Sequence, residues 1–543
     1  MNQQGKSAMS QGMVCAPQPE AVEAGAVVLK EGGNAVDAAI ATALVQTAID
    51  PFMSGIAGFG SMHVYLPDRG VHQCLDFHAR APGSATPEMW QDLMIGEAED
   101  GFGFILKGSV NEIGYQSIAT PESLQAYATA LEKWGTRSLA DLIQPAIGYL
   151  EDGWMVRPHV RRFWEQEEPG GRVQHIEYLR ASPATAKIYL NGDGTMKNMG
   201  DIIRNPDLAR TYRRIAEAGA EDFYEGEIAG KIVADMQTNG GLISADDLKN
   251  AGPEDTDVLW IDYRGFRIAS SPPPGGGVMV LEMLNILENF NLQGMGHNSP
   301  DYIRTVAEAM KIATVDKDRH VGDPRYVDVP LSRLLSKDYA REQAERIKAG
   351  EITHVPRLQK GEDQKETTHL CTVDTSGNCV SMTHSLGMPS GVTSDGLGFI
   401  YNGCMGVFDP RPGQTGSIAP GKARFTSMAP SMVFKDGKPH LLIGAPGGTY
   451  IAMGVVQGIL NALDFGMTAA EAVAAPRFSA TSDIIEIVNR IPRFVQAELE
   501  DAGYTFRRYP LNYHFAGVHA IRISDEGLDG GADPGRDGMA LKV

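Results

Sequence analysis

The spacing of apolar and polar positions changes near the middle of the chain. A charged run over residues 359–366 gives way to residues 367–373, where Leu370 and Cys371 fall on opposite faces of an alternating segment. A two-residue period is that of a β-strand. Turn residues then lead into a second strand-like segment over 379–385. We therefore predict a β-hairpin that is entered from a loop.

Helical periods dominate the first 350 residues. Apolar positions recur at helical spacing over residues 19–29, 36–47, 120–134, 208–218, 228–238 and 302–316, and short strands are predicted over 62–66, 74–77 and 263–269. Asn34 supplies a helix N-cap, and Ser244 with Asp247 has the shape of a capping box. The glycine-rich run over 54–61 reads as a tight turn that brings backbone close to another element.

The composition becomes richer in β-strands after residue 367. Strands are predicted over residues 425–434, 440–443, 485–488 and 518–523, and helices over 449–463 and 469–475. Asp436-Gly437 is a hairpin turn, and residues 348–365 are the best linker candidate. Helices and antiparallel hairpins on both sides of this linker predict a layered α/β architecture.

Thr367 stands where an N-terminal nucleophile would stand, at the start of a buried strand that follows a loop. Cleavage of the Glu366–Thr367 bond would give Thr367 a free α-amine beside its own hydroxyl. An α-amino group titrates near ~8, so it can be a neutral base at working pH. One residue would then supply both nucleophile and base. An ordinary strand start, where threonine is common, is the alternative that these residues alone leave open.

Several blocks of sequence resemble, in the same order, those of the γ-glutamyltranspeptidase family. They lie at residues 30–39, 262–265 with 272–274, 285–290, 367–369 with 373–374 and 377–378, 444–448 and 475–478. The resemblance runs from about Gly12 to the C-terminus. Members are self-cleaving N-terminal-nucleophile (Ntn) hydrolases. The resemblance therefore implies a four-layer αββα sandwich, formed by a large fragment, residues 1–366, intertwined with a small fragment, residues 367–543.

The resemblance also assigns roles to single residues beside the nucleophile Thr367. It places oxyanion donors at the backbone amides of Gly447 and Gly448, where glycine leaves the N–H groups accessible. A plain turn is the alternative for these glycines taken alone. Ser385 occupies the place of a threonine whose hydroxyl contacts the nucleophile's amine. The family holds the substrate carboxylate with a pair of serines, and here that pair is Thr426 and Ser427.

Two departures concern the family's carboxylate clamp. The family reads Asp-x-Arg-Glu-x-Ala-Pro, whereas residues 76–82 read Asp-Phe-His-Ala-Arg-Ala-Pro. His78 replaces the clamping arginine, and Arg80 lies two residues later. On a strand, a shift of two residues keeps the same face but moves the side chain ~6.6 Å along. We expect Arg80 and His78 to take part in substrate binding, with Arg80 on a substrate carboxylate; a surface or inter-subunit ion pair is the alternative for Arg80.

The family's partners for the substrate ammonium are lost together. Cys404 and Val407 replace a glutamine and an aspartate that grip the α-ammonium, and Gly387 replaces an asparagine. A buried ammonium without an acidic partner costs several kcal/mol. We therefore expect an acyl group that keeps a carboxylate but lacks the α-amine, of oxamate or glutaryl type. True γ-glutamyltransferase or glutathione hydrolase activity, and a non-catalytic binding homologue, are the alternatives.

The net charge of the chain argues against two classes of binding partner. The formal net charge of −20 argues against nucleic acid and against an anionic membrane surface, since both attract basic proteins. No run of eighteen apolar residues occurs, so no spanning helix is predicted. The first residues lack the apolar stretch of a secretory signal, and we expect a cytoplasmic protein.

Cysteine and histidine spacing predicts neither a disulfide framework nor a metal site. The five cysteines include no C-x-x-C pair, and the thirteen histidines show no ligand spacing. We expect buried thiols and no cofactor. The expected partners are a small amide or γ-glutamyl substrate and a water or amine acceptor. The two fragments are expected to associate, and a further homo-oligomer is left open.

Overall fold

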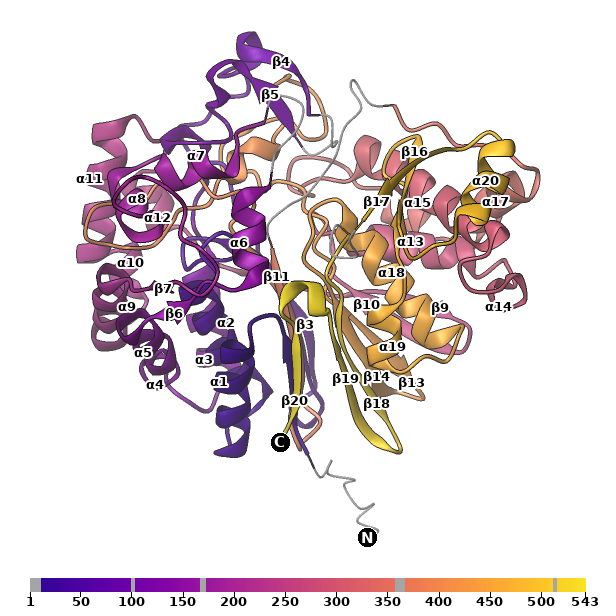
Figure 1. Ribbon diagram of the computed structural model, residues 1–543, viewed down its shortest axis with the longest axis horizontal. Helices are drawn as coiled ribbons and strands as arrows, with labels where there is room; N and C mark the ends of the chain where they lie inside the picture. Colours follow the sequence, from indigo (N-terminus) through magenta and orange to yellow (C-terminus); the bar gives the residue numbers. More distant parts are fainter. Residues whose placement is uncertain (1–10, 99–102, 167–171, 357–366, 511–514) are drawn as a thin grey trace.

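Two β-sheets packed face to face form the centre of the molecule, and helices cover the outer face of each (Figure 1). The computed structural model describes residues 11–98, 103–166, 172–356, 367–510 and 515–543. The four layers are those of the predicted αββα sandwich. Helices of the first half cover one sheet, and helices from residue 277 onward cover the other.

The first sheet is a seven-stranded antiparallel sheet that interleaves strands from both sides of residue 366. Its order is β20 (Met539–Lys542), β1 (Met13–Ala16), β11 (Thr368–Val373), β12 (Cys379–Ser385), β2 (Phe59–Leu66), β3 (Val71–Phe77) and β8 (Glu254–Thr256). The predicted hairpin is thus β11–β12, with Thr368 opposite His384. Strands β1 and β2 flank it, so the residue before β11 is held in the middle of the sheet.

The second sheet has six antiparallel strands. Its order is β19 (Gly527–Ala532), β18 (His519–Ser524), β14 (Lys438–Gly444), β13 (Ser431–Lys435), β10 (Phe266–Ser270) and β9 (Leu259–Tyr263). Cys371 and Val373 of β11 pack between the two sheets with Met432 and Leu442 of the second. Leu370 points to the helices instead, as the alternation predicts. All five cysteine side chains are buried.

The helical layers bury the outer faces of the sheets. The first layer includes α1 (Pro19–Lys30), α2 (Ala35–Ile49), α3 (Ser123–Trp134), α4 (Leu139–Leu142), α5 (Gln144–Asp152), α6 (Pro158–Glu165), α7 (His175–Arg180), α8 (Pro183–Tyr189), α9 (Pro206–Ala218), α10 (Glu221–Tyr224), α11 (Glu227–Asn239) and α12 (Ala245–Lys249). The second includes α13 (Gly277–Leu287), α14 (Leu292–Met295), α15 (Pro300–His320), α16 (Leu331–Leu334), α17 (Lys337–Lys348), α18 (Tyr450–Leu463), α19 (Ala469–Ala474) and α20 (Arg493–Asp501). The remaining strands form two small two-stranded sheets and one three-stranded sheet. The two-stranded sheets are β4 (Met94–Glu97) with β5 (Phe104–Leu106), and β6 (Trp154–Met155) with β7 (Ile202–Ile203); the three-stranded sheet has the order β15 (Phe478–Ser479), β16 (Ile484–Val488) and β17 (Thr505–Tyr509).

Helix α2 lies directly on the strands of the hairpin. Asn34 accepts hydrogen bonds from two amides of the first turn, and Asp37 completes a capping box, so the predicted N-cap is confirmed. Every residue of α2 is buried, because one side packs on the sheet and the other under α1 and α5. Thr372 of β11 donates to the carbonyl of Ala35 at 2.7 Å, which ties the helix start to the sheet.

Two predicted strands differ from the structure. The strand expected over 263–269 is a hairpin, because Arg264 and Gly265 take left-handed conformations, with φ of 47° and 81°, and form the turn between β9 and β10. The strand expected over 425–434 begins only at Ser431. Pro430 has no N–H to donate to a ladder, so pairing starts after it.

The third difference is the start of α3. The helix predicted from Thr120 begins at Ser123, without a side-chain cap at Glu122. The Thr120 amide instead donates to the carbonyl of Arg80 at 3.0 Å, and this bridge keeps the backbone extended. In the described ranges, no helix combines the length and apolarity needed to cross a membrane.

Gly444, at the end of β14, faces the imidazole ring of His369 in β11, and a Cβ atom there would overlap the ring. We expect Gly444→Ala to lower the free energy of unfolding by about 1–3 kcal/mol, because the buried ring has to move to make room. Urea unfolding followed by tryptophan fluorescence would measure it. Gly148→Ala, in open space on α5, is the control and should change stability by less than about 1 kcal/mol. Equal midpoints for the two variants would contradict the expectation.

Candidate active site

The start of β11 and the end of β12 bring the predicted nucleophile together with Ser385. The Oγ1 atom of Thr367 lies 3.3 Å from the Oγ of Ser385, and both side chains are buried. The register, with Thr368 opposite His384, sets Ser385 across from Thr367. The Gly387 amide donates to Ser385 Oγ at 2.8 Å. This bond fixes the position of the serine oxygen, which is the neighbour of the Thr367 hydroxyl.

A buried hydrogen-bond network lies beneath the nucleophile. Gln46 Nε2 donates to Thr368 Oγ1 at 2.9 Å, and Gln46 Oε1 lies 2.8 Å from His384 Nε2. The amide oxygen can only accept, so His384 Nε2 donates and its Nδ1 accepts from the Tyr127 hydroxyl at 2.7 Å. Burial lowers the pKa of His384 to about 3, which keeps the ring neutral in this arrangement. The sequence analysis missed these three partners, because they are far apart in the chain.

Gly447 and Gly448 link β14 to α18. Their backbone φ angles, 134° and 53°, are left-handed values that favour glycine. The amides of Tyr450 and Ile451 donate to the carbonyls of Gly447 and Gly448, so the two glycines lead into the first turn of the helix. The positive end of the helix dipole therefore adds to the N–H groups there. N–H groups at the start of a helix can stabilise an oxyanion, and the role of the two amides stays a prediction.

Thr426 and Ser427 are buried on the segment that precedes β13. The Thr426 amide donates to the carbonyl of Pro274 at 2.9 Å, and Thr426 Oγ1 accepts from the amide of Met428 at 3.3 Å. A Cβ atom on Gly276 would collide with the backbone of Ser427. The two hydroxyl residues are thus held firmly against the turn before α13.

Arg80 and His78 lie on the segment that follows β3. Arg80 donates to Glu122 at 2.7 Å and lies 3.0 Å from a carboxylate oxygen of Glu254. The guanidinium is thus part of a largely buried ion-pair network within the chain. The Nε2 atom of His78 lies 2.9 Å from Asp76. Within the described part of the chain, neither side chain is seen in contact with Thr367, and their part in substrate binding stays a prediction.

Two of the residues that replace the family's ammonium partners, Gly387 and Cys404, lie beside another arginine, Arg424. A Cβ atom on Gly387 would lie 2.9 Å from Cys404 Sγ and 3.6 Å from Arg424 Nη2. The guanidinium of Arg424 stacks over the ring of Phe59, 4.6 Å from its centroid. Arg424 was not singled out in the sequence; its position two residues before Thr426 was the available signal. Its side chain lies beside the turn that follows Ser385.

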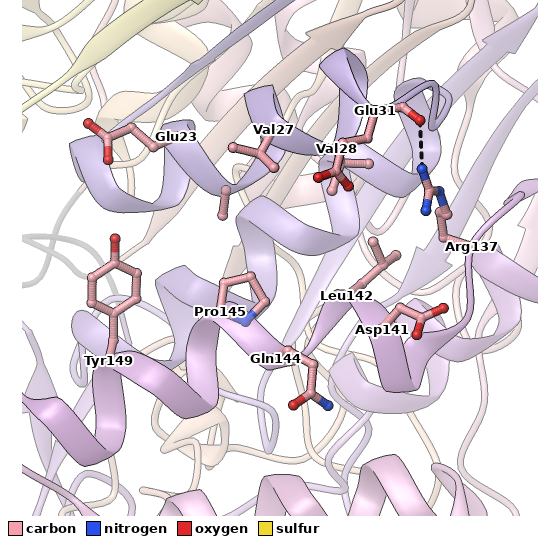
Figure 2. A pocket seen from close by; sticks show the side chains of 11 residues that line it. Glu23, Val27, Val28, Glu31, Arg137, Asp141, Leu142, Gln144, Pro145 and Tyr149 are labelled. Atoms are coloured by element: carbon pink, nitrogen blue, oxygen red, sulfur yellow. Dashed lines mark hydrogen bonds between the residues drawn. The ribbon is translucent and has the colours of Figure 1, made fainter.

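A separate hollow of about 420 Å³ lies in the first helical layer, between α1 and α4–α5 (Figure 2). It is lined by Val27 and Leu142 together with Glu23, Asp141 and Tyr149. None of the predicted site residues lines it, so it is distinct from the nucleophile's surroundings. Within the described part of the chain, no group of three or more metal-ligating side chains is gathered.

We expect Ser385→Ala to lower kcat about 10- to 100-fold, because it removes the hydroxyl that positions Thr367. Ser385→Thr keeps that hydroxyl and should retain most activity. Steady-state kinetics on an amide substrate would measure both. Equal losses for the two variants would show that side-chain size, rather than the hydroxyl, sets the effect.

Two antiparallel sheets between helical layers, with a threonine at the start of a central strand, define an Ntn hydrolase. The family model described as gamma-glutamyltranspeptidase matches residues 21–543. The acylase ACY 1 proenzyme of Pseudomonas sp. (strain V22) is 35% identical over 540 residues, which cover 98% of this chain and 94% of that protein. The glutathione hydrolase proenzyme of Bacillus subtilis (strain 168) is 32% identical over 556 residues, or 98% and 91% of the two chains.

A solved structure has the same fold. The crystal structure of cephalosporin acylase from Bacillus halodurans matches with a TM-score of 0.83 and 28% identity, covering 100% of this chain and 97% of that one. The protein belongs to the gamma-glutamyltranspeptidase family. It is an enzyme of the amide hydrolase and acyltransferase type, and the predicted family and fold class are confirmed.

Proposed function

We propose that the chain cuts itself between Glu366 and Thr367 and then works as an N-terminal-threonine amidohydrolase. The contact between Thr367 Oγ1 and Ser385 Oγ carries the proposal, because it sets a buried hydroxyl at the start of β11. The proenzyme names of both curated relatives support processing. The fragments, residues 1–366 and 367–543, would stay together because strands of one lie between strands of the other.

In the proposed reaction, Thr367 Oγ1 attacks the substrate's amide carbonyl carbon. Its proton passes to the free α-amine of Thr367, and the oxyanion that forms accepts hydrogen bonds from the amides of Gly447 and Gly448. The carbon–nitrogen bond then breaks, and the leaving amine takes the proton. Water, or an acceptor amine, attacks the resulting ester, releases the acyl group and regenerates the hydroxyl.

The acyl group in this proposal carries a carboxylate and lacks an α-amine. The replacement of three ammonium partners by Gly387, Cys404 and Val407 supports it, since a buried ammonium needs acceptors and negative charge. Oxamate-like and glutaryl-like acyl groups meet this description. The similarity to proteins named as acylases agrees with it.

Hydrolysis of glutaryl, oxalyl and γ-glutamyl anilides by the processed wild-type protein tests the proposal. We expect kcat/KM for the best amine-free acid to exceed that for the γ-glutamyl anilide at least tenfold. The amine is the only difference between the glutaryl and γ-glutamyl compounds, so this pair isolates its effect. Preference for the γ-glutamyl compound would favour the second candidate, a glutathione hydrolase, which the Bacillus subtilis relative supports.

A further inference from the structure

Arg424 is a buried cation beside the nucleophile's hairpin. Its backbone runs next to the segment that carries His78, and its amide donates to the carbonyl of Ala79 at 3.4 Å. The side chain is only 3% exposed and lies over the ring of Phe59. Phe59 pairs with Ser385 across the β2–β12 ladder. The register therefore brings the guanidinium to the end of β12, where Ser385 meets Thr367.

Two of the three substituted ammonium-binding positions, Gly387 and Cys404, lie beside Arg424. A Cβ atom on Gly387 would lie 3.6 Å from Arg424 Nη2 and 3.3 Å from the Phe59 ring. The Sγ atom of Cys404 would lie 2.9 Å from the same Cβ atom. Gly387 also has a left-handed φ of 77°. A larger side chain has no room there, so the guanidinium and the thiol fill the volume that an asparagine side chain would use.

We propose that Arg424 binds the carboxylate of the acyl group and repels an α-ammonium at the same place. This inference rests on the proposed amide hydrolysis and names the residue that would select its substrates. A guanidinium presents a planar fork that fits a carboxylate with two hydrogen bonds. A like charge brought against it is unfavourable in a buried site. In this site, the same set of substitutions would then remove the partners of the α-ammonium and select an acyl group that carries a carboxylate.

The electrostatics of the buried guanidinium agree with this assignment. Burial lowers the pKa of Arg424 below its ordinary value, because desolvation disfavours the charged form. A carboxylate that arrives from the substrate would restore the lost stabilisation of the charge. Arg80, on the segment after β3, forms ion pairs with Glu122 and Glu254. The two arginines therefore make a matched pair for a test.

The test compares Arg424→Met with Arg80→Met on three anilides of similar length: glutaryl, γ-glutamyl and neutral pentanoyl. For Arg424→Met we expect kcat/KM for the glutaryl compound to fall about 100-fold, while the pentanoyl compound changes less than threefold. Arg80→Met tests the competing assignment, in which Arg80 binds the carboxylate; if Arg424 binds it instead, Arg80→Met leaves the glutaryl-to-pentanoyl ratio within threefold of the wild-type ratio. Arg267→Met, which removes an exposed charge from β10, controls for net charge.

The wild-type rates decide the proposed function, and the variant ratios decide the role of Arg424. An unchanged glutaryl-to-pentanoyl ratio in Arg424→Met overturns the inference and leaves amide hydrolysis intact. Loss of that ratio in Arg80→Met alone would assign the carboxylate to Arg80 instead. Arg424→Lys keeps the charge without the fork, and we expect it to keep the preference for the acid with about tenfold lower kcat/KM.

A measurement on the wild-type protein covers the case in which the variants do not mature. Because Arg424 is only 3% exposed, phenylglyoxal can reach it only through the substrate site that the inference places there. Peptide mass spectrometry locates the modified side chains. We expect glutarate, but not pentanamide, to reduce modification of Arg424 at least fivefold. Equal modification of Arg424 with and without glutarate would also overturn the inference.

Discussion

Replacing Thr367 with alanine is expected to leave the chain uncut and to abolish amide hydrolysis. The change removes the hydroxyl that lies 3.3 Å from Ser385 and would attack both the chain and the substrate. Loss of a covalent nucleophile lowers the rate roughly 10⁴- to 10⁶-fold in hydrolases with such chemistry. Intact-mass spectrometry should show two wild-type fragments, the smaller starting at Thr367, and one full-length variant chain.

Two further variants separate chemistry from folding. Thr367→Ser keeps the hydroxyl and should still be cut, at a lower rate, because the missing methyl group frees the χ1 rotation. Thr375→Ala changes an exposed threonine in the turn after β11 and should behave like wild type. A fragment that starts at residue 367 in the Thr367→Ala preparation would contradict the assignment. So would a wild-type chain that stays whole.

Replacing Gly447 with alanine should give the second-largest loss, about 10²- to 10³-fold in kcat. The residue has a φ of 134°, which L side chains rarely adopt, and a Cβ atom would lie 2.8 Å from the Cα atom of Ala516. The backbone must shift to relieve the strain at this φ angle and the clash with Ala516. The shift changes the direction of the N–H groups of Gly447 and Gly448. Because these amides would act on the oxyanion, KM should change much less than kcat.

Gly437→Ala is the matched control for backbone strain. Gly437 lies in the β13–β14 hairpin turn at a φ of 77°, and a Cβ atom there meets nothing within 4 Å. We expect a loss of about 1 kcal/mol in stability and an unchanged kcat. Circular dichroism and a urea midpoint would confirm that the Gly447 variant is folded. A folded Gly447→Ala protein with kcat within threefold of wild type would exclude an oxyanion role for this amide.

Local patterns predicted those elements whose period or end signals are strong. The hairpin at 367–385, the cap at Asn34 and the helix over 449–463 match the structure closely, because alternation, capping and helical spacing act over a few residues. The errors occur where a backbone feature interrupts the period. The left-handed turn at Arg264-Gly265 splits one predicted strand, and Pro430 shortens another.

The sequence by itself determined the family, the layered fold and the candidate nucleophile Thr367, since these follow from local periods and from blocks that keep their order. The tertiary structure decided which side chains surround that threonine. Gln46 and His384 meet only because α2 packs on β12, and Arg424 reaches the end of β12 only because Phe59 pairs with Ser385. Such contacts depend on sheet register and on layer packing, which join residues hundreds of positions apart and leave no periodic signal in the chain.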